Sequence, residues 1–536
     1  MLFSVRYYTI EYSETYRKRR NIMKKKLLSL LLVLVLVPTA VLCGCNDGQS
    51  SGGTSTTPES SSGTPVSGGE ITVGIATDLY SSLDPHVSSS TAGTREVLFN
   101  IFEGLLKPDS DGNLVPAIAE SYTVNDTADE YTFVLRQGVK FHNGAAVTVG
   151  DVVYSITRAA GLETGEPLMS VLSGVTAVET DGDRTVTITL SAPDTEFAAY
   201  CTAAIIPEGN DPAEELIGTG PFMFVSRTPG EQIVLDKFAD YWGTPAYLDR
   251  VTLKVIENSE TLIMSLRSGA IDLTTHLEYS QVANLSGLNI LQDSMHLVQA
   301  LYLNHSYEPF ADARVRQALC YAIDKHAIIE LAGDGNGTAL GSSMYPAFGR
   351  YFMDELTDYY EYNPDKAREL LAEAGYEDLS FSIAVISSYT PHVDTASVIV
   401  EQLRAVGVEA TIDLMESETW LSEVYQGHDF EATITGMDAS TLTASALLYR
   451  FTSDSPKNFI SFQNADYDTA YAAAVASTDT EAQTEYFKAC ETILTEEAAN
   501  VYIQDLAEFV AMQSDLAGFK FYPLSALDLA AIYYTE

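Results

Sequence analysis

The feature that most constrains this 536-residue chain is a junction in its middle, residues 300–331, where a strand pattern gives way to a helix pattern. Leu301 and Leu303 alternate with Tyr302 and Asn304, which is the period-two spacing of a β-strand with different side chains on its two faces. Helical spacing begins about ten residues later. We therefore predict that the chain leaves one compact body here and begins another.

Helix signals follow this strand closely. Asp312 stands where a helix N-cap is expected, and the apolar residues after it are spaced i, i+3, i+4, i+7 and i+8. These are Val315, Ala318, Leu319, Ala322 and Ile323. Arg314 and Arg316 flank the stripe. Asp324 is expected to cap a second helix, which carries Ala327, Ile328 and Leu331 inward.

Strand and helix patterns alternate after the junction, which predicts an α/β architecture with a parallel, doubly wound sheet. Asn363 and Pro364 begin a helix, and Gly375 ends it. Strand patterns follow at 381–386, 408–414 and 430–435. In open sheets of this kind ligands bind beyond the carboxyl ends of the strands, a rule that points to the loop Thr435–Thr441.

Six segments stand out in order along the chain. They are GLLKPDSDGNLVPAIAESY (104–122), YTFVLRQGVKFHNGAAVTVGDVVYSITRA (131–159), GTGPF (218–222), DYWGTPAYLDRVTLKVI (240–256), SLRSGAIDL (265–273) and LYLNHSYEPFADARVRQALCYAIDK (301–325). Together they resemble the bacterial extracellular solute-binding proteins of family 5, the substrate-binding lipoproteins of ABC importers for oligopeptides, dipeptides, nickel complexes and some oligosaccharides. The resemblance extends roughly from Gly69 to Tyr534.

The resemblance implies a two-lobed α/β fold like that of periplasmic binding proteins, in the large three-domain cluster of type II, with doubly wound mixed sheets and a hinge. We expect the first lobe to combine residues 71–99, 208–302 and 506–536. Residues 100–207 would form an accessory domain, and residues 303–505 the second lobe.

The N-terminus carries an export pattern. Lys24–Lys26 precede an apolar run, 27–42, which is typical of a signal peptide rather than a membrane span. Leu42-Cys43-Gly44-Cys45 resembles a lipoprotein signal-peptidase box. It implies lipidation of Cys45 and a location on the outer face of the cytoplasmic membrane. The alternative is a cleaved, freely secreted protein.

The segments around this box complete the predicted organisation. Residues 1–44 are expected to be an N-terminal extension plus the signal peptide, with Met23 as the true start. The Ser/Thr/Gly-rich residues 45–70 are expected to be a flexible tether, because they contain too little apolar surface to bury.

The charge balance excludes one class of function. The chain has 74 acidic and 30 basic residues and a formal charge of −44. Nucleic-acid binding needs a basic surface, so this class is disfavoured. The acidity is typical of a solvated surface that keeps an exported protein soluble, and a preference for cationic ligands is the alternative.

Candidate ligand-binding residues come first from the resemblance. The loop after the first strand faces the ligand in the family, which implies Tyr80, Leu83 and Asp84. In peptide-binding members, a carboxylate after the strand equivalent to 430–435 pairs with the peptide ammonium. This segment is here Gly436-Met437-Asp438-Ala439-Ser440, in which Asp438 or Ser440 stands at that place and Met437 replaces an aromatic residue.

Other candidates come from the chemistry of nearby side chains. Tyr302, Trp420 and Met437 offer surfaces that can line a pocket or stack on a sugar ring, and Asn304 shares a strand face with Tyr302. Arg450 is one of few cations in this region. It can bind a ligand carboxylate with two hydrogen bonds or pair with a surface acid.

The resemblance implies ligand capture between two closing lobes, with delivery to a membrane permease driven by a separate ATPase. It implies a monomer without cofactor or catalysis, and the sequence contains no Gly-x-Ser-x-Gly, His-Glu-x-x-His or P-loop motif.

The histidines lack metal-ligand spacing, and Cys201, Cys320 and Cys490 are expected to be small buried residues. Short peptides are the expected ligands. Oligosaccharides and nickel chelates are alternatives, as is a surface sensor or adhesin with the same fold.

Overall fold

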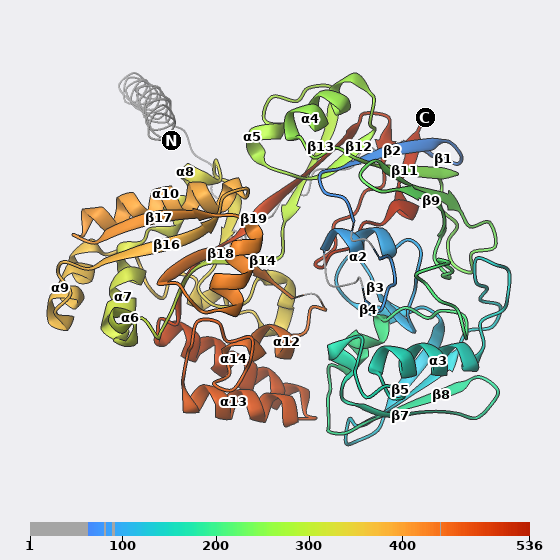
Figure 1. The fold of residues 1–536 in the computed structure, drawn as a ribbon, viewed down its shortest axis with the longest axis horizontal. Coiled ribbons are helices and arrows are strands. Elements are labelled where there is room, and N and C mark those ends of the chain that lie inside the picture. Colours follow the sequence, from blue (N-terminus) through green and yellow to red (C-terminus); the bar gives the residue numbers. More distant parts are fainter. Residues whose placement is uncertain (1–62, 80–81, 88–91, 440) are drawn as a thin grey trace, which may run out of the picture. The chain divides into compact units, whose positions relative to one another are not determined.

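The computed structural model describes residues 63–79, 82–87, 92–439 and 441–536, and a mixed sheet of twelve strands runs through this part of the chain (Figure 1). The strand order is β17 (Glu409–Met415), β16 (Ser380–Ile386), β18 (Ala432–Asp438), β14 (Leu297–Leu303), β19 (Asn500–Gln513), β12 (Leu273–Leu277), β2 (Glu70–Ile75), β11 (Arg250–Val255), β10 (Gln232–Lys237) and β9 (Phe222–Thr228). Two further strands, β13 (Leu288–Ser294) and β15 (Gly337–Ala339), also pair with β19.

The long strand β19 joins two bodies of sheet. Its first part pairs with β14, and its last part pairs with β12 and β13. The register of the β14–β19 ladder shifts between Gln299 and Ala300. The chain thus passes between the bodies just before β14 and again within β19.

The first body is built from three separate stretches of the chain, since β2 pairs in parallel with both β11 and β12. Its core also takes buried residues from the C-terminal segment, such as Leu516 and Ile532. Asn258 caps one of its helices, which a left-handed Gly269 ends. The helices and short elements are α2 (Ala92–Leu98), α4 (Ser259–Ser268), α5 (Tyr279–Val282), β20 (Leu516–Ala517), η8 (Leu529–Ala531) and β21 (Tyr533–Thr535).

One short strand lies within the segment predicted to be a tether. In β1 (Pro65–Val66), Pro65 is paired with Thr535 and Val66 with Tyr534 of β21. Glu70 is already the first residue of β2. The prediction of a flexible tether up to residue 70 is therefore wrong for these residues. The C-terminal strand offers them backbone hydrogen bonds that composition does not reveal.

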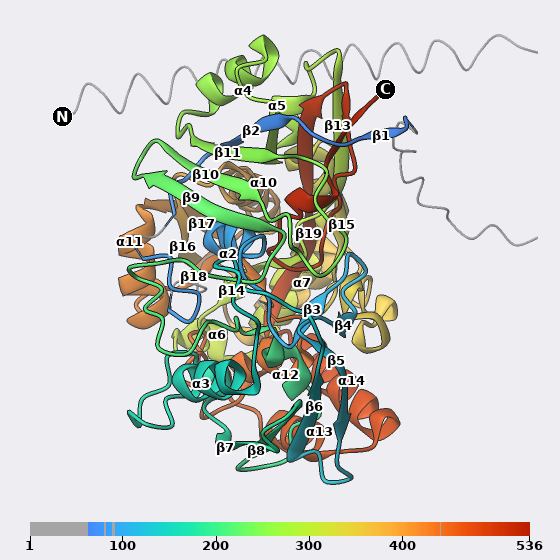
Figure 2. The ribbon, with the colours of Figure 1, turned by 90° about the vertical axis from the view of Figure 1, so that its right-hand side faces the viewer.

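Residues 105–217 contribute a separate hydrophobic core, and their strands and helix lie together in Figure 2. A four-stranded antiparallel sheet has the order β5 (Ala119–Val124), β6 (Glu130–Leu135), β8 (Thr185–Leu190) and β7 (Val175–Thr180). The helix α3 (Val149–Ala160) begins with a capping box between Thr148 and Asp151, so Asp151 stabilises the helix start. The remaining elements are β3 (Leu106–Pro108), β4 (Leu114–Pro116), η2 (Ser170–Leu172) and η3 (Phe197–Thr202).

In the second body, helices cover both faces of the sheet. Leu301 and Leu303 face a core with the longer helices that follow β14, whereas Tyr302 faces a second core with the C-terminal helices. The first set is α7 (Ala313–Ala322), α8 (Lys325–Ala332), α9 (Pro364–Ala374) and α10 (Thr390–Ala405). The second set is η4 (Pro346–Tyr351), α12 (Ala444–Leu448), α13 (Ala465–Ala476) and α14 (Thr480–Glu496). Short elements are α6 (Glu308–Ala311), η5 (Asp354–Leu356), α11 (Ser417–Thr419), η6 (Trp420–Gln426) and η7 (Tyr449–Phe451).

The predicted helix caps are confirmed. The Asp312 side chain accepts a hydrogen bond from the Arg314 amide, and the Asp324 side chain accepts one from the Ala327 amide. Asn363 caps α9, which ends at a left-handed Gly375. Cys201, Cys320 and Cys490 are buried free thiols, as expected.

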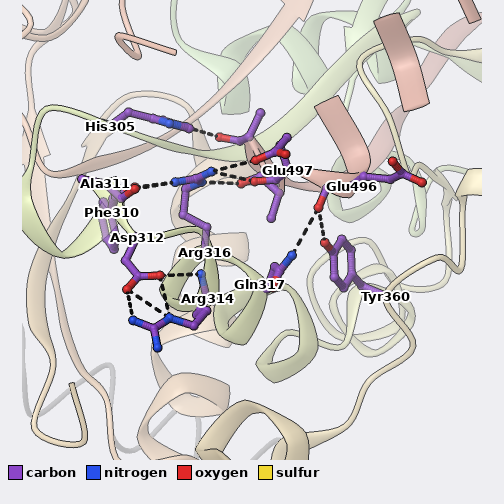
Figure 3. Close-up of polar contacts among 12 residues, drawn as sticks. His305, Phe310, Ala311, Asp312, Arg314, Arg316, Gln317, Tyr360, Glu496 and Glu497 are labelled. Carbon is purple, nitrogen blue, oxygen red and sulfur yellow. Dashed lines mark hydrogen bonds and ion pairs between the residues drawn. The ribbon is translucent and has the colours of Figure 1, made fainter. Parts of the chain in front are cut away.

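Arg316 lies inside the protein although it flanks the apolar stripe of α7. The residue is 4% exposed, and its guanidinium donates to four backbone carbonyls (Figure 3). The acceptors are Phe310 at 2.8 Å, Ala311 at 3.3 Å, Glu497 at 2.8 Å and Ala498 at 3.1 Å. The arginine therefore joins the start of α7 to the turn before β19.

Two titratable groups with raised pKa values, His276 and Asp505, lie in the first body and in β19. The imidazole of His276 bridges the carboxylates of Glu96 and Glu508, each at 2.9 Å. Burial alone lowers the pKa of His276, but the two carboxylates outweigh burial and raise it well above its ordinary value. Asp505 is fully buried, and burial, with Asp293 and Glu508 nearby, raises its pKa to about 8.

Candidate functional site

A large cavity of about 1500 Å³ is lined by segments that are far apart in the sequence. The lining takes residues from 85–122, 168–204, 221–247, 438–457 and 518–533. It includes Asp438, the last residue of β18, and Ala439 and Thr441, which follow the strand. The strand-end rule, which pointed to the loop 435–441, thus identified one wall of this cavity.

Asp438 is the acidic residue at this wall. One of its carboxylate oxygens lies 3.6 Å from Nη2 of Arg95, and its side chain remains 56% exposed. Arg95 comes from α2 and also donates to Oγ of Ser525 at 3.0 Å. Burial lowers the pKa of Arg95, and the negative charges of Asp438 and Glu96 oppose this shift. The carboxylate of Asp438 is therefore accessible to a ligand.

Arg450 lies in η7, on the same side of the cavity as Asp438. Its Nε donates to the carbonyl of Leu447 at 3.1 Å, and its Nη1 lies 2.8 Å from Sδ of Met437. Its Nη2 is 3.4 Å from the Asp438 carbonyl oxygen. These neutral contacts fix the orientation of the guanidinium without neutralising its charge.

Glu103 anchors a polar cluster in another wall. It accepts hydrogen bonds from Lys107 at 3.1 Å, Tyr241 at 2.7 Å and Trp242 at 2.6 Å. Burial and the adjacent Glu103 carboxylate raise the pKa of Tyr241. Because its oxygens already have these donors, Glu103 stabilises the wall rather than offering a free carboxylate.

The carboxylate of Glu196 reaches from the region of η3 to the start of α12. Its two oxygens accept from the amides of Ala444 and Ser445, both at 2.9 Å. Close by, Gln483 donates to the hydroxyl of Thr195 at 2.5 Å. Burial raises the pKa of Glu196, and the amide hydrogen bonds oppose this shift. The contact holds the loop after Asp438 against residues that belong to the predicted accessory domain.

Of the candidates in the loop after β2, Tyr80 lies outside the described residues. Leu83 is buried in the core of the first body. Asp84 is also buried, and both of its oxygens pair with the guanidinium of Arg158. The cavity is instead lined by the next residues, including His86, whose Nε2 donates to the Ala204 carbonyl at 2.8 Å.

The aromatic candidates and Asn304 lie in the core. Tyr302 is fully buried, and its hydroxyl donates to the Val298 carbonyl. Trp420 packs beside β16 and donates to the hydroxyl of Thr433 at 2.9 Å. Asn304 donates to two carbonyls of the segment 428–430. The cavity lining contains none of these three residues.

The remaining candidates lie in or beside β18. Gly436 pairs with Gln299, and a side chain at Gly436 would collide with Leu297. Met437 is buried and touches Arg450 through its sulfur. Ser440 and the predicted lipidation site Cys45 lie outside the described residues. Among the predicted residues that the structure describes, Asp438 and Arg450 line the cavity.

Sequence reasoning missed other charged residues of the lining, namely Arg95, Lys107, Glu103, Lys457, Lys520 and Asp528. No local pattern marks them, because they meet only through the tertiary fold. Within the described ranges, no group of three or more His, Cys, Asp or Glu side chains is arranged to hold a metal. In the same ranges, no helix is long and apolar enough to span a membrane.

Comparisons with known proteins agree with this architecture. The profile described as bacterial extracellular solute-binding proteins, family 5, matches residues 113–459. The oligopeptide-binding protein AppA of Bacillus subtilis is 27% identical, over 94% of this chain and 97% of its own length. Its structure in complex with a nonapeptide aligns with a TM-score of 0.72 and 25% identity, over 88% of this chain and 100% of that one.

Two further comparisons extend the likeness. The glutathione-binding protein GsiB of Salmonella typhimurium is 29% identical, over 83% of this chain and 90% of its own. The substrate-binding protein CtaP of Listeria monocytogenes shares the fold with a TM-score of 0.79 at 23% identity, over 88% of this chain and 100% of that one.

Proposed function

This chain belongs to the bacterial extracellular solute-binding proteins of family 5, and we propose that it captures short peptides for import across the cytoplasmic membrane. Membership makes it a substrate-binding component of an ABC importer for peptides or related ligands, and not an enzyme. Its fold is that of the type II periplasmic binding proteins. The choice of peptides and the residues that bind them form the proposal.

The cavity with Asp438 in its wall is the observation that carries the proposal. At about 1500 Å³ it exceeds the roughly 300–1,000 Å³ of sites for drug-sized ligands, which favours a ligand as extended as a peptide. AppA binds oligopeptides and GsiB binds glutathione, according to their names. A peptide-sized cavity in a relative of both proteins supports a peptide ligand.

Asp438 is the residue that we assign to the peptide ammonium. Its carboxylate is more than half exposed and faces Arg95 at 3.6 Å, which is longer than a direct charged hydrogen bond. A ligand ammonium that enters this wall can therefore take a shorter contact with the free oxygen lone pairs. An ammonium buried without such a partner would cost several kcal/mol.

Capture is proposed to occur by closure of the two bodies around the ligand. The chain crosses between them just before β14 and within β19, so these crossings are the proposed hinge. A ligand shifts the open–closed equilibrium only through its greater affinity for the closed form. Contacts from opposite walls, such as Asp438 and the residues of α2, supply this difference.

We further propose that the protein acts as a monomer held at the outer face of the cytoplasmic membrane by a lipid on Cys45. The closed form would deliver its cargo to a permease driven by a separate ATPase. Palmitate labelling of cells that express the protein and a Cys45→Ala variant tests the anchor. Loss of label and release of the variant from membranes are expected, and a labelled variant would contradict lipidation at this residue.

The first test of the ligand is native mass spectrometry of protein purified without denaturation. Co-purified masses that match short peptides, and that disappear on unfolding, are expected. Asp438→Asn should then weaken peptide binding by at least about tenfold, since a charged hydrogen bond contributes about 1.5–3 kcal/mol. The matched control is Asp413→Asn, which removes an exposed carboxylate outside the cavity.

Other outcomes would overturn the choice of peptide. An empty protein would be screened by thermal shift, in which ligand at about 100 times its Kd adds about 2.7 kcal/mol of stability. Stabilisation by oligosaccharides or by nickel–histidine, but not by peptides, would replace the ligand and keep the importer. Undiminished uptake of every ligand found, in cells that lack the gene, would favour a sensor or adhesin.

A further inference from the structure

One polar contact joins the predicted accessory domain to the second body outside the cavity. The two oxygens of Glu196 accept from the amides of Ala444 and Ser445 in α12, both at 2.9 Å. The hydroxyl of the neighbouring Thr195 accepts at 2.5 Å from the side-chain amide of Gln483 in α14. The cavity lining that the structure describes includes none of these five residues. The contact therefore consists of protein groups alone, and a ligand in the cavity takes no part in it.

The predicted accessory domain is fastened to the first body on its other sides. The guanidinium of Arg158 in α3 pairs with both oxygens of Asp84, in the loop after β2. The imidazole Nε2 of His142 lies 3.0 Å from the carbonyl oxygen of Gly220, shortly before β9. The contact at Glu196 therefore connects the first body to the second by way of this domain.

The donors on the second body are held in place from their own side. The side-chain oxygen of Gln483 accepts from the hydroxyl of Tyr351 at 3.2 Å, and its amide also donates to the Ala474 carbonyl at 3.2 Å. The hydroxyl of Tyr471 donates to the Ser445 carbonyl at 3.0 Å. The first amides of a helix have no acceptor within the helix. Because these donors are already fixed, little conformational entropy is lost when the carboxylate and hydroxyl of the other side reach them.

We propose that Glu196 and Thr195 form a latch, which closes on α12 and Gln483 and holds part of the empty protein in the closed form. The inference deepens the proposed function, because it rests on the closure of the two bodies that is proposed there. Contacts that form with and without ligand stabilise both closed forms equally. The latch therefore raises the closed fraction before a ligand arrives, and it slows the opening that releases a bound ligand.

Single-molecule FRET on protein that native mass spectrometry shows to be empty measures the closed fraction directly. Dyes are attached through p-azidophenylalanine at Asp183, between β7 and β8, and at Asp378, shortly before β16. Both positions are exposed and outside the cavity. We expect an open and a closed population. In Glu196→Gln the ratio of closed to open molecules should fall about tenfold, because hydrogen bonds to a charged group are lost.

A second variant removes a donor from the other side of the latch. Ala444 is the first residue of α12, where proline fits a helix, and Thr443 before it is extended, as a residue before proline must be. Ala444→Pro should also lower the ratio. Combined with Glu196→Gln, it should lower the ratio by less than the product of the two single effects, since both variants break one contact. A variant that merely fails to fold would not show this coupling.

The matched control for charge is Glu163→Gln. It removes an exposed carboxylate of the predicted accessory domain, outside the cavity, and should keep the ratio of the wild-type protein. Only open molecules in the empty wild-type protein, or equal ratios in wild type and Glu196→Gln, would overturn the latch and leave the ligand site standing.

Ligand kinetics connect the latch to capture. With tetra-alanine as the probe, in stopped-flow mixing followed by the FRET signal, Glu196→Gln should release the peptide about tenfold faster. Association should be unchanged or faster, because more molecules are open. An unchanged release rate would overturn the hold of the latch on the ligand. If tetra-alanine does not bind, the choice of peptide fails, and the FRET ratios of the empty protein still decide on the latch.

Discussion

Replacement of Arg316 by alanine should strongly destabilise the second body. Arg316 is 4% exposed, and its guanidinium satisfies four carbonyls at 2.8–3.3 Å (Figure 3). A buried acceptor left without a donor costs about 1–3 kcal/mol. Because water can enter the vacated space and serve some of the carbonyls, we expect a total loss of about 3–5 kcal/mol, less than four unsatisfied acceptors would cost together.

The ion pair with Glu497 contributes little to this figure. The two groups are 3.8 Å apart and the glutamate side chain is 47% exposed, so the pair accounts for at most about 1 kcal/mol. Arg316→Lys should recover only part of the loss, because one ammonium cannot reach both the carbonyls of 310–311 and those of 497–498 that the planar guanidinium joins. Arg314→Ala is the matched control on the same helix, since its side chain is 48% exposed and should cost less than about 1 kcal/mol.

Urea unfolding followed by tryptophan fluorescence measures these changes. The chain has two tryptophans, and only Trp420 lies in the same body as Arg316. A Trp242→Phe background therefore restricts the signal to that body. The midpoint should fall in Arg316→Ala with an unchanged slope. A loss no greater than that of Arg314→Ala would refute the view that the four carbonyls depend on this arginine.

Three other predictions follow from charged groups already described. Glu196→Gln should raise the Kd of the ligand about three- to tenfold by calorimetry, because it removes the charge that holds the start of α12; an unchanged Kd would contradict this role. His276→Gln should destabilise the protein by up to about 1 kcal/mol at pH 5.5. The raised pKa of His276 gives the folded protein stability that is complete below pH 6.5 and disappears as the pH rises through the folded-state pKa. Urea midpoints at pH 5.5 and 9.5 measure it, and an equal loss at both would refute the charged pairing. Asp505 changes stability with pH in the same direction but for another reason, because burial disfavours its charged form and its raised pKa costs the folded protein stability as the pH rises from about 4 to about 8. Asp505→Asn should therefore add about 1–3 kcal/mol at pH 9 and little at pH 4, and a gain independent of pH would contradict ionisation as the cause.

Local signals predicted local structure well. The caps at Asp312, Asp324 and Asn363 are correct, because a cap needs only a short polar side chain and the next few amides. The loop after β18 was found at the cavity because the position of a site beyond strand ends follows from topology, not from individual contacts.

The burial of particular side chains could not be predicted in the same way. Tyr302 and Trp420 belong to the core because helices cover both faces of their sheet, so neither face opens to a ligand. Arg316 flanks its apolar stripe like Arg314, and only the turn at 497–498, far away in the sequence, explains why it is buried. Arg95 and Lys457 meet the same cavity from segments more than 350 residues apart, a relation that spacing along the chain does not record.

The pairing of β1 with β21 decides which half of the protein a membrane attachment would hold. Residues 65–66 and 533–535 meet in one small sheet, and Leu516 and Ile532 pack into the core of the first body. A lipid on Cys45 would thus fasten the first body and leave the second to move during closure. A fluorescent label attached after Glu536 would report on the fastened half alone. To follow ligand capture with a pair of fluorophores, the second fluorophore must be attached to the second body, beyond β14.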